Sequence, residues 1–331
     1  MTNTPKEKPA SNSLVKWLLN VISTPSIGPF LALLISGGFF YTQNERFIQP
    51  QNLSLILQQT SWIAALAIGQ TLVILTAGID LSNGLVMALG TVIMTKMAVV
   101  NGVDPVIAIG MGFLVIMAFG LLNGLLVTQL KLPPFIVTLG TLNIAFALTR
   151  IYTTATINGL PPIQRIFGER VDLFGTSFTY GSLFVFVLYI VMWFVLRETA
   201  FGRHIYAVGD DREAARLMGV PVNRVLIQVY VLAGFFYAIG GWLLIGRIGS
   251  GDPNAGQTAN LDSITAVVIG GTSLFGGRGN LLGTLVGALI VGVFINGLQI
   301  TGVDPLYQRL ITGVLVILAV TLDQVVSKKA R

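Results

Sequence analysis

The side chains that could carry chemistry in this sequence of 331 residues are few, and most of them are neutral. No cysteine is present, which excludes disulfides, thiol nucleophiles and cysteine-ligated metals. The only histidine, His204, lies in a polar segment and is expected to be solvated. Neither a nucleophile with its base nor a pair of carboxylates occurs, so an enzyme within the membrane is the least favoured class of function. We therefore expect no catalytic residue, no metal site and no cofactor.

Acidic residues are confined to expected loops and helix ends. All 14 of them have this placement, and no lysine or arginine interrupts the middle of an apolar run. Asp80 and Asp262 each immediately precede such a run, where a carboxylate commonly caps a helix by accepting from its free N–H groups. Helix capping is therefore favoured over substrate contact for both. Because a charge in mid-bilayer usually marks an ion or proton route, its absence argues against an ion-coupled carrier.

Neutral amides and hydroxyls inside the apolar runs are the remaining groups able to bind a polar solute. Each can hydrogen-bond a sugar hydroxyl, although bonding to a neighbouring helix is the common use of such groups in membranes. Together with the two carboxylates above, they form the candidate set for a translocation pathway: Asp80, Ser82, Asn123, Thr138, Thr141, Asn143, Asp262 and Asn296.

The composition indicates what surrounds these groups. Hydrophobic residues make up 53% of the chain, mean hydropathy is +0.80 and only 10% of residues are charged, against about 25% in an average soluble domain. A single soluble core cannot enclose that much apolar surface, so the sequence predicts an all-α integral membrane protein with about ten transmembrane helices. The expected spans are residues 27–42, 53–76, 83–100, 105–128, 134–154, 179–197, 224–247, 262–275, 281–300 and 307–325. The 262–275 run is short, and whether it spans or is re-entrant stays open.

Basic residues predict the orientation of these spans. With the N-terminus in the cytoplasm, 13 of the 20 lysines and arginines fall on the cytoplasmic side and 7 on the other, as the positive-inside rule expects. The net charge of +6 is thus explained by the membrane, and no nucleic-acid partner is expected. Both termini are placed in the cytoplasm, with a segment 1–26, a membrane domain 27–326 and a tail 327–331. No removable signal peptide is expected, because a small-residue cleavage pattern is missing.

Two internal echoes predict that the ten spans form a 5+5 inverted repeat. Asp80-Leu-Ser82 leads to Gly90-Thr91, and Asp262-Ser263 leads to Gly271-Thr272, with the same spacing from serine to glycine. A second echo, Asn-Gly-Leu, occurs at 123–125 and at 296–298. Both echoes are offset by five spans, and an odd number of spans forces opposite orientations. Repeats of this kind place the substrate route at their interface.

The longest expected cytoplasmic loop, residues 198–222, contains a well-marked short helix. Asp210 and Glu213 form a capping-box-like start, and Gly219 followed by Pro221 ends the helix. Its apolar side chains must be buried either on the bundle itself or in a groove of a partner. The residues of this element that could couple the chain to a partner are Asp210, Glu213, Ala214, Ala215, Arg216, Leu217 and Gly219.

Several stretches resemble one known family. They are TAGIDLSNG (76–84), LNGLLVTQLKLPPFIVTLGTLN (122–143), GDDREAARLMGVPVNRV (209–225) and DSITAVVIGGTSLFGGRGNLLGTLVGALI (262–290). The chain is similar to the permease subunits of bacterial ABC monosaccharide importers, the group that imports ribose, xylose, galactose or fructose, and most of all to fructose- or ribose-type members. The likeness extends over most of the chain from about residue 50.

The resemblance implies an assembly in the bacterial inner membrane. It would contain a second permease copy or a paralogue, two ATPase subunits and a periplasmic sugar-binding protein, with membrane lipid around it. The 210–219 helix would dock on the ATPase, and polar groups of the spans 83–154 and 262–300 would line the route. ATP hydrolysis would take place in a partner chain, since this sequence has no P-loop.

Four other functions remain open on the sequence alone. A branched-chain amino-acid permease has the same architecture, although a zwitterion would favour charged groups along the route. Importers of sugar-like signalling molecules are a second possibility. A secondary carrier would need no ATPase and would respond to an ion gradient. A passive channel would need neither, and the 210–219 helix would then have no purpose.

Overall fold

The computed structural model describes residues 27–173 and 175–304, followed by short stretches between residues 306 and 321. The predicted segment 1–26 and the tail 327–331 lie outside the described residues, and so does most of the predicted span 307–325. The described part is mostly helical, which confirms the predicted class of fold.

Nine of the predicted apolar runs form helices in the described part of the chain. Eight agree with their predicted bounds to within three residues: α2 (Ile27–Gln43), α3 (Pro50–Leu75), α4 (Asn83–Val99), α5 (Pro105–Thr128), α6 (Pro134–Tyr152), α8 (Tyr180–Glu198), α11 (Val222–Ile248) and α13 (Leu281–Ile300). Prolines begin α3, α5 and α6. Proline suits this position because the N–H of the first helical residue has no acceptor within the helix, so its absence breaks no hydrogen bond. The ninth helix, α12 (Ala259–Ile269), differs from its prediction.

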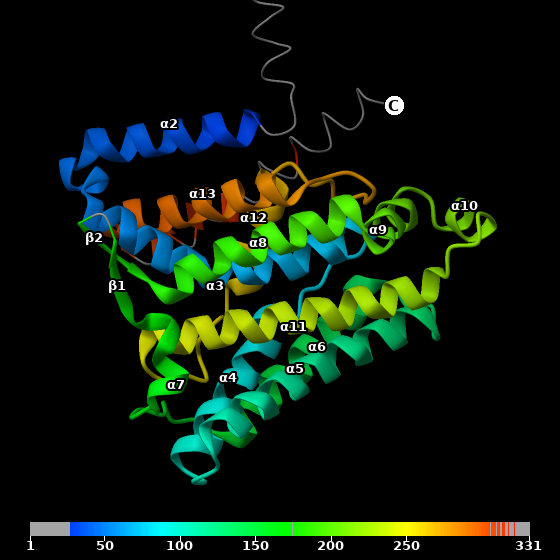
Figure 1. Ribbon diagram of the computed structural model, residues 1–331, viewed down its shortest axis with the longest axis horizontal. Helices are drawn as coiled ribbons and strands as arrows, with labels where there is room; N and C mark the ends of the chain where they lie inside the picture. Colours follow the sequence, from blue (N-terminus) through cyan, green and yellow to red (C-terminus); the bar gives the residue numbers. More distant parts are fainter. Residues whose placement is uncertain are drawn as a thin grey trace, which may run out of the picture.

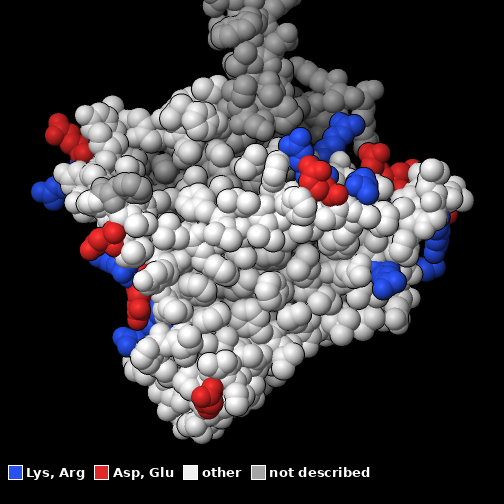
Figure 2. Space-filling model, viewed as in Figure 1, with Lys and Arg blue, Asp and Glu red and all other residues white. Residues whose placement is uncertain are grey.

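The long helices run roughly side by side along one direction (Figure 1). In the described part, α5, α6, α8, α11 and α13 are long and apolar enough, by length and composition, to cross a membrane. On the face drawn in Figure 2, charged side chains gather mainly at the two ends of this direction and leave a broad uncharged band between them. Large apolar side chains such as Leu114 and Ile190 are exposed on the surface. This is the surface of a multi-pass membrane protein.

α3 and α11 form the centre of the bundle. They contact each other, and every residue of α3 from Ile63 to Leu75 is buried. α3 also packs against α12 and α13, whereas α11 packs against α4 and α5. In the same way, α4 packs on α5 and α12 packs on α13. Under an offset of five spans, α3 corresponds to α11, α4 to α12 and α5 to α13, so these contacts occur in matching pairs.

α12 is a half-length helix. Its 11 residues cover about 16 Å, roughly half of the ~30 Å hydrocarbon core of a bilayer. The helix begins three residues earlier than predicted because its first turn is polar and carries no apolar signal, and Gly270-Gly271 follow its last residue. Asp262 is consequently the fourth residue of the helix, and the prediction that it caps the helix is wrong. Thr258 occupies the N-cap position.

The two ends of the bundle carry shorter elements, which lie at opposite sides of Figure 1. One end, here called the α10 end, carries α9 (Ala200–Asp210) and α10 (Arg212–Leu217). The other, called the hairpin end, carries η1 (Glu45–Ile48), α7 (Pro162–Arg165), η2 (Ile166–Gly168) and an antiparallel pair of strands, β1 (Arg170–Leu173) and β2 (Thr176–Thr179). The hairpin was not predicted, because four-residue strands in a polar loop carry little hydropathy signal.

Two helices in the 198–222 loop replace the single one that was predicted. Asp210 was expected to cap the helix, but it is the last residue of α9. Asp211 is the cap instead, and its carboxylate accepts from the backbone N–H groups of Glu213 and Ala214 at 2.8 and 2.9 Å. Asp211 takes this role because its backbone is extended, which breaks the helical path between α9 and α10. The predicted stop is confirmed, since Gly219 has a φ of +84°.

Candidate functional site

The segment 76–82 between α3 and α4 is partly buried: Thr76, Gly78, Asp80 and Ser82 are buried, whereas Ala77 is exposed. Asp80 is only 1% exposed, and its carboxylate accepts from the backbone N–H and the hydroxyl of Ser82 at 2.8 and 2.6 Å. Ser82 holds the N-cap position of α4. Asp80 is therefore not the N-cap residue itself, but its carboxylate accepts a backbone N–H at the start of α4, as predicted. A carboxylate thus lies inside the bundle. It belongs to the segment that connects α3 to α4 and not to one of the apolar runs.

Polar side chains from five helices or their ends meet at this point. Asn83 at the start of α4 donates to Gln70 of α3 at 3.1 Å and to Ser263 of α12 at 2.8 Å. Asn123 of α5 donates to the Ser82 hydroxyl at 3.2 Å. The Tyr237 hydroxyl of α11 lies 3.4 Å from Gln70. We call this set the central polar cluster; it consists of Gln70, Asp80, Ser82, Asn83, Asn123, Tyr237 and Ser263, all buried.

The central polar cluster has hydrogen-bonding capacity that the described residues do not use. Four buried atoms in or beside it have no partner among them: Gln70 Nε2, Asn83 Oδ1, Asn123 Oδ1 and the hydroxyl of Tyr230. Buried polar groups are nearly always paired, so these atoms are ready to bind water or the hydroxyls of a polar solute. The surrounding helices are closed over the cluster in this conformation, since each of its members is buried.

The structure places the other predicted pathway residues at varying distance from this cluster. Thr138 of α6 adjoins it, because its hydroxyl donates to the Ile79 carbonyl at 3.1 Å. Thr141 is buried and bonds within its own helix, to the Val137 carbonyl at 3.3 Å. Asp262 is buried and accepts from the Thr258 hydroxyl at 3.3 Å. Each of these three groups is thus occupied within the bundle.

Asn296 and Asn143 lie elsewhere. Asn296 of α13 accepts from Asn52, near the start of α3 at the hairpin end, at 2.9 Å. Asn143 is exposed on the outer face of α6, where its amide donates to the Leu139 carbonyl of its own helix at 2.9 Å. The structure therefore unites Asp80, Ser82 and Asn123 but not Asn143, Asp262 or Asn296.

Sequence reasoning missed four members of the cluster. Gln70, Asn83, Tyr237 and Ser263 each lie within or beside an apolar run, where single polar residues are common and carry no spacing signal. One signal was present, because Asn83 directly follows Asp80-Leu-Ser82 and Ser263 directly follows Asp262. The inverted echo thus contained Ser263 and adjoined Asn83, the two members of the contact between α4 and α12.

The outer face of α6 carries a polar group among exposed apolar side chains. Asn143 lies there with Phe135, Leu139 and Phe146, all of them exposed. A polar amide in the middle of a span usually faces protein or water rather than lipid. This face is therefore a candidate for contact with another chain.

α10 forms a second candidate surface at its end of the bundle. It lies at the far right of Figure 1, beyond the ends of the long helices. Leu217 and Met218 are 81% and 85% exposed, although both are apolar. Ala215 is 5% exposed and packs on the bundle, so it is not free to contact a partner. The other predicted coupling residues, Asp210, Glu213, Ala214, Arg216, Leu217 and Gly219, are exposed.

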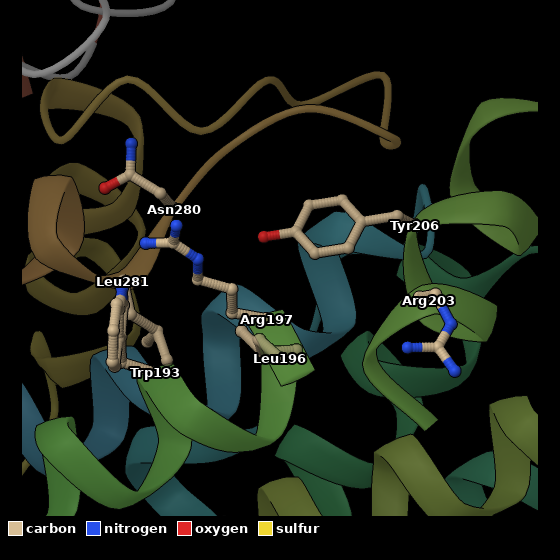
Figure 3. A pocket seen from close by; sticks show the side chains of 7 residues that line it. All are labelled: Trp193, Leu196, Arg197, Arg203, Tyr206, Asn280 and Leu281. Atoms are coloured by element: carbon tan, nitrogen blue, oxygen red, sulfur yellow. The ribbon is translucent and has the colours of Figure 1, made fainter. Parts of the chain in front are cut away.

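Two pockets lie away from the central polar cluster. The first has a volume of about 490 Å³ and lies between the end of α8, α9 and the start of α13. In it the Arg197 guanidinium lies between Asn280 and Tyr206 (Figure 3). The Tyr206 hydroxyl donates to the Gly279 carbonyl at 2.9 Å, and burial raises the pKa of Tyr206. It therefore remains a donor that links α9 to the α12–α13 loop.

The second pocket, of about 610 Å³, lies along α11 and the end of α5. Its lining is mainly apolar and includes His204, which is partly buried rather than fully solvated as expected. Neither pocket contains a member of the central polar cluster. Among the described residues, no group of three or more His, Asp or Glu side chains is arranged to hold a metal ion.

The sequence was compared with known proteins. The family described as "Branched-chain amino acid transport system / permease component" matches residues 52–320. The chain is 46% identical to the fructose import permease protein FrcC of Rhizobium meliloti, over 93% of this chain and 88% of the relative. It is 40% identical to the ribose import permease protein RbsC of Bacillus subtilis (strain 168), with 90% and 92% covered. No solved structure matches it.

A third relative extends the same pattern to another sugar. The galactose/methyl galactoside import permease protein MglC of Escherichia coli (strain K12) is 35% identical, with 89% of this chain and 93% of the relative covered. The matched region contains the central polar cluster, α9 and α10, so the site described above lies within the shared part. The chain therefore belongs to the family of permease components of the branched-chain amino acid transport system type.

Proposed function

We propose that this chain is the transmembrane subunit of an ABC importer that moves a monosaccharide across the bacterial inner membrane. The observation that carries the proposal is the 46% identity to a fructose import permease over 93% of the chain. Relatives named for ribose and galactose import match over a similar length. A fructose- or ribose-like sugar is the proposed substrate, delivered by a periplasmic binding protein.

The proposed topology has ten spans in a 5+5 inverted repeat, with the α10 end in the cytoplasm. Two observations support it. The helix contacts occur in pairs related by the five-span offset, as expected when one repeat is the inverted copy of the other. Basic side chains gather in the α8–α11 connection, with Arg197, Arg203, Arg212, Arg216 and Arg224, which fits a cytoplasmic location.

The proposed docking site for an ATPase subunit is α10. Leu217 and Met218 at its end are apolar and exposed to solvent. Burying an apolar side chain of this size against a partner contributes about 1.5–3 kcal/mol to the free energy of binding. The ion pair between Glu213 and Arg216, at 3.8 Å, lies on the same short helix and adds polar contacts at its rim. ATP hydrolysis belongs to the partner, and this chain supplies the transport pathway.

A second copy of the chain is the proposed partner of the α6 face. The exposed Asn143 would then lie between two subunits instead of against lipid, where it can contact the solute or the other copy. The central polar cluster offers amide and hydroxyl groups with unused capacity. Such groups suit a neutral, polyhydroxylated solute better than a zwitterionic amino acid, for which the family as a whole is described.

One observation favours a second candidate, an ion-coupled carrier. Asp80 is a carboxylate inside the bundle, and buried carboxylates commonly mark ion or proton routes. In this chain, however, one oxygen of Asp80 already accepts two hydrogen bonds from Ser82. The geometry thus favours a structural role, and the ABC assignment has the stronger support.

The experiment is purification of the tagged chain from its native membrane, followed by reconstitution of whatever co-purifies. The proposal expects a stoichiometric ATPase subunit and sugar uptake that requires ATP and a binding protein. The control is uptake in the same vesicles under a proton or sodium gradient without ATP. If the chain purifies alone and moves sugar under the gradient, the ion-coupled alternative holds and the ABC proposal fails.

A further inference from the structure

Arg212 connects the short helix α10 to the transmembrane part of the chain. It is the first residue of α10, and its Nη2 donates to the carbonyl of Thr76 at 3.0 Å. Thr76 is the C-cap residue of α3 and is buried. The ion pairs among the described residues are Arg197–Glu198 and Glu213–Arg216, so Arg212 has no acidic partner there. Arg212 is exposed, and its guanidinium bonds to the end of α3 through this one hydrogen bond.

The backbone around this contact forms a tight junction of three segments. Gly277, in the α12–α13 loop, donates its N–H to the Leu75 carbonyl of α3 at 3.0 Å. Gly209, near the end of α9, packs onto both: a Cβ added to it would lie 1.7 Å from Leu75 O and 2.6 Å from Gly277 N. Gly209 therefore packs closely on the end of α3 and on the α12–α13 loop, with no room for a side chain between them.

The segment that begins at Thr76 leads directly into the central polar cluster. Ala77 adopts a φ of +57°, which an L-residue rarely adopts, so this segment has little room to relax. Asp80 at its far end holds Ser82 at the N-cap of α4 through two hydrogen bonds. The Tyr230 hydroxyl of α11 lies beside the same segment, next to Gly78. The segment is thus held at both ends by charged side chains.

Displacement of Thr76 would therefore reach several helices at once. Ser82 contacts Asn123 of α5, and the adjoining Asn83 contacts α3 and α12. α4 and α12 correspond to each other under the five-span offset, and their contact lies between the two halves of the bundle. Displacement of Thr76 would therefore alter the contact between α4 and α12, where the two halves of the bundle meet.

We propose that Arg212 is a positioning residue for transport, which links the movement of α10 to segment 76–82 and through it to the contact between α4 and α12. This proposal rests on the proposed function, in which α10 moves with an ATPase. Arg212 acts through the Thr76 carbonyl and does not touch the solute. Its role is distinct from docking, which we assign to Leu217, Met218 and the Glu213–Arg216 pair.

The first test uses the reconstituted complex of this chain, its ATPase and its binding protein. Three variants are compared with the natural chain: Arg212→Gln, Arg212→Lys and the control Arg203→Gln, which changes an exposed arginine on α9 bonded only to the Glu198 carbonyl. Three quantities are measured: the ATPase bound per permease, basal ATP hydrolysis, and sugar molecules moved per ATP.

Arg212→Gln is expected to keep the ATPase and its basal hydrolysis and to lower sugar moved per ATP by about tenfold, within the range of typical coupling effects. Arg212→Lys should restore part of it, because lysine retains a charged donor but lacks the reach of the planar guanidinium. Arg203→Gln should match the natural chain. The proposal is overturned if Arg212→Gln couples normally. It is equally overturned if that variant releases the ATPase, since Arg212 would then be a docking residue.

The second test measures the movement of segment 76–82 directly and does not require sugar transport. Because the chain has no cysteine, Ala77→Cys introduces a single thiol at an exposed position of segment 76–82. Its maleimide labelling rate is measured in the complex with and without trapping of the ATPase by vanadate. The rate should change severalfold on trapping, and Arg212→Gln should abolish that change.

An equal change in labelling with and without Arg212 would refute the link. If Arg212→Gln gives no monodisperse complex, the comparison is made with Arg212→Lys, for which an intermediate change is expected and an unaltered one contradicts the proposal. Failure of the proposed function would be seen earlier and separately, as absence of any ATPase bound to the natural chain.

Discussion

Asn83 of α4 donates a hydrogen bond of 2.8 Å to the hydroxyl of Ser263 of α12, a residue 180 positions away in the sequence. Ser263 matches Ser82 in the inverted echo, and Asn83 is the residue that directly follows Ser82. The same amide also donates to Gln70 of α3 at 3.1 Å. One side chain thus joins α4 and α12 to α3 at the centre of the bundle.

Replacement of Asn83 should destabilise the folded chain. Asn83→Ala would leave Gln70 Oε1 and Ser263 Oγ without this donor, and the loss of buried hydrogen bonds is expected to cost about 1–3 kcal/mol. The measurement is unfolding of the detergent-solubilised chain, followed by circular dichroism. The matched control is Asn143→Ala, since Asn143 is exposed and bonds only within α6. Equal stability of both variants would contradict the role given to Asn83.

Gly209 should not tolerate even one added methyl group. Gly209→Ala would place Cβ 1.7 Å from the Leu75 carbonyl oxygen, and relieving that overlap should cost more than about 3 kcal/mol. The yield of monodisperse protein and its midpoint of thermal unfolding measure the effect. Gly110→Ala in α5 is the control, because nothing lies within 4 Å of its added Cβ. A normal Gly209→Ala protein would disprove the tight junction at this point.

The exposed apolar pair on α10 should determine ATPase binding without affecting the fold. Leu217→Ser with Met218→Ser removes two side chains that are 81% and 85% exposed, so the chain itself should keep its stability. The affinity for the ATPase should fall by at least about tenfold, since each tenfold corresponds to only about 1.4 kcal/mol. Pull-down with graded ATPase concentrations measures it. Leu306→Ser, at an exposed position beyond α13, should bind as the natural chain does.

Asp80 should be needed as an acceptor and not as a carrier of ions. Asp80→Asn keeps an oxygen that can accept from Ser82, so ATP-driven uptake should fall only a few-fold, because a neutral acceptor bonds about half as strongly as a charged one. Asp80→Ala removes the acceptor and should lower uptake by more than tenfold. Uptake is measured in vesicles at several sodium concentrations and pH values. A dependence on either ion that Asp80→Asn eliminates would favour the ion-coupled alternative.

A second copy against α6 should be detectable by cross-linking. Asn143→Cys introduces the only thiol of the chain, and two copies in contact at this face should form a disulfide-linked dimer on mild oxidation in membranes. Leu114→Cys in α5 is the control, as an exposed position on another helix. Dimer formation by the control alone would place the contact elsewhere.

Hydropathy was sufficient to locate the long helices, but not to define the polar starts of the helices or the connecting segments. Runs of apolar residues placed α5 and α13 to the residue, because both helices are apolar along their full length. The same signal misplaced α12, whose first turn contains Asn260 and Asp262. The choice between Asp210 and Asp211 as the cap of α10 depended on a single extended residue, which two adjacent aspartates do not reveal.

The site was predictable only in part, for a physical reason. Asp80, Ser82 and Asn123 were identified because they are polar residues near the ends of apolar runs. The cluster members Gln70 and Tyr237 lie on α3 and α11, and the contacts between these helices depend on packing between segments distant in sequence. Arg212 gave no signal at all, since an arginine at the start of a loop helix is ordinarily a solvated residue.

The position of the N-termini of α4 and α12 also has an electrostatic consequence. The N-terminus of a helix carries the equivalent of about half a positive charge, and the first turns of α4 and α12 meet where Asn260 of α12 donates to the Leu81 carbonyl at 3.3 Å. Together they present about one positive charge beside the carboxylate of Asp80, and the carboxylate of Asp262 lies in the first turn of α12 itself. These backbone dipoles therefore offset part of the buried negative charge, which reduces the attraction of the interior for a free cation. A pathway of this kind should favour a neutral solute over protons and sodium.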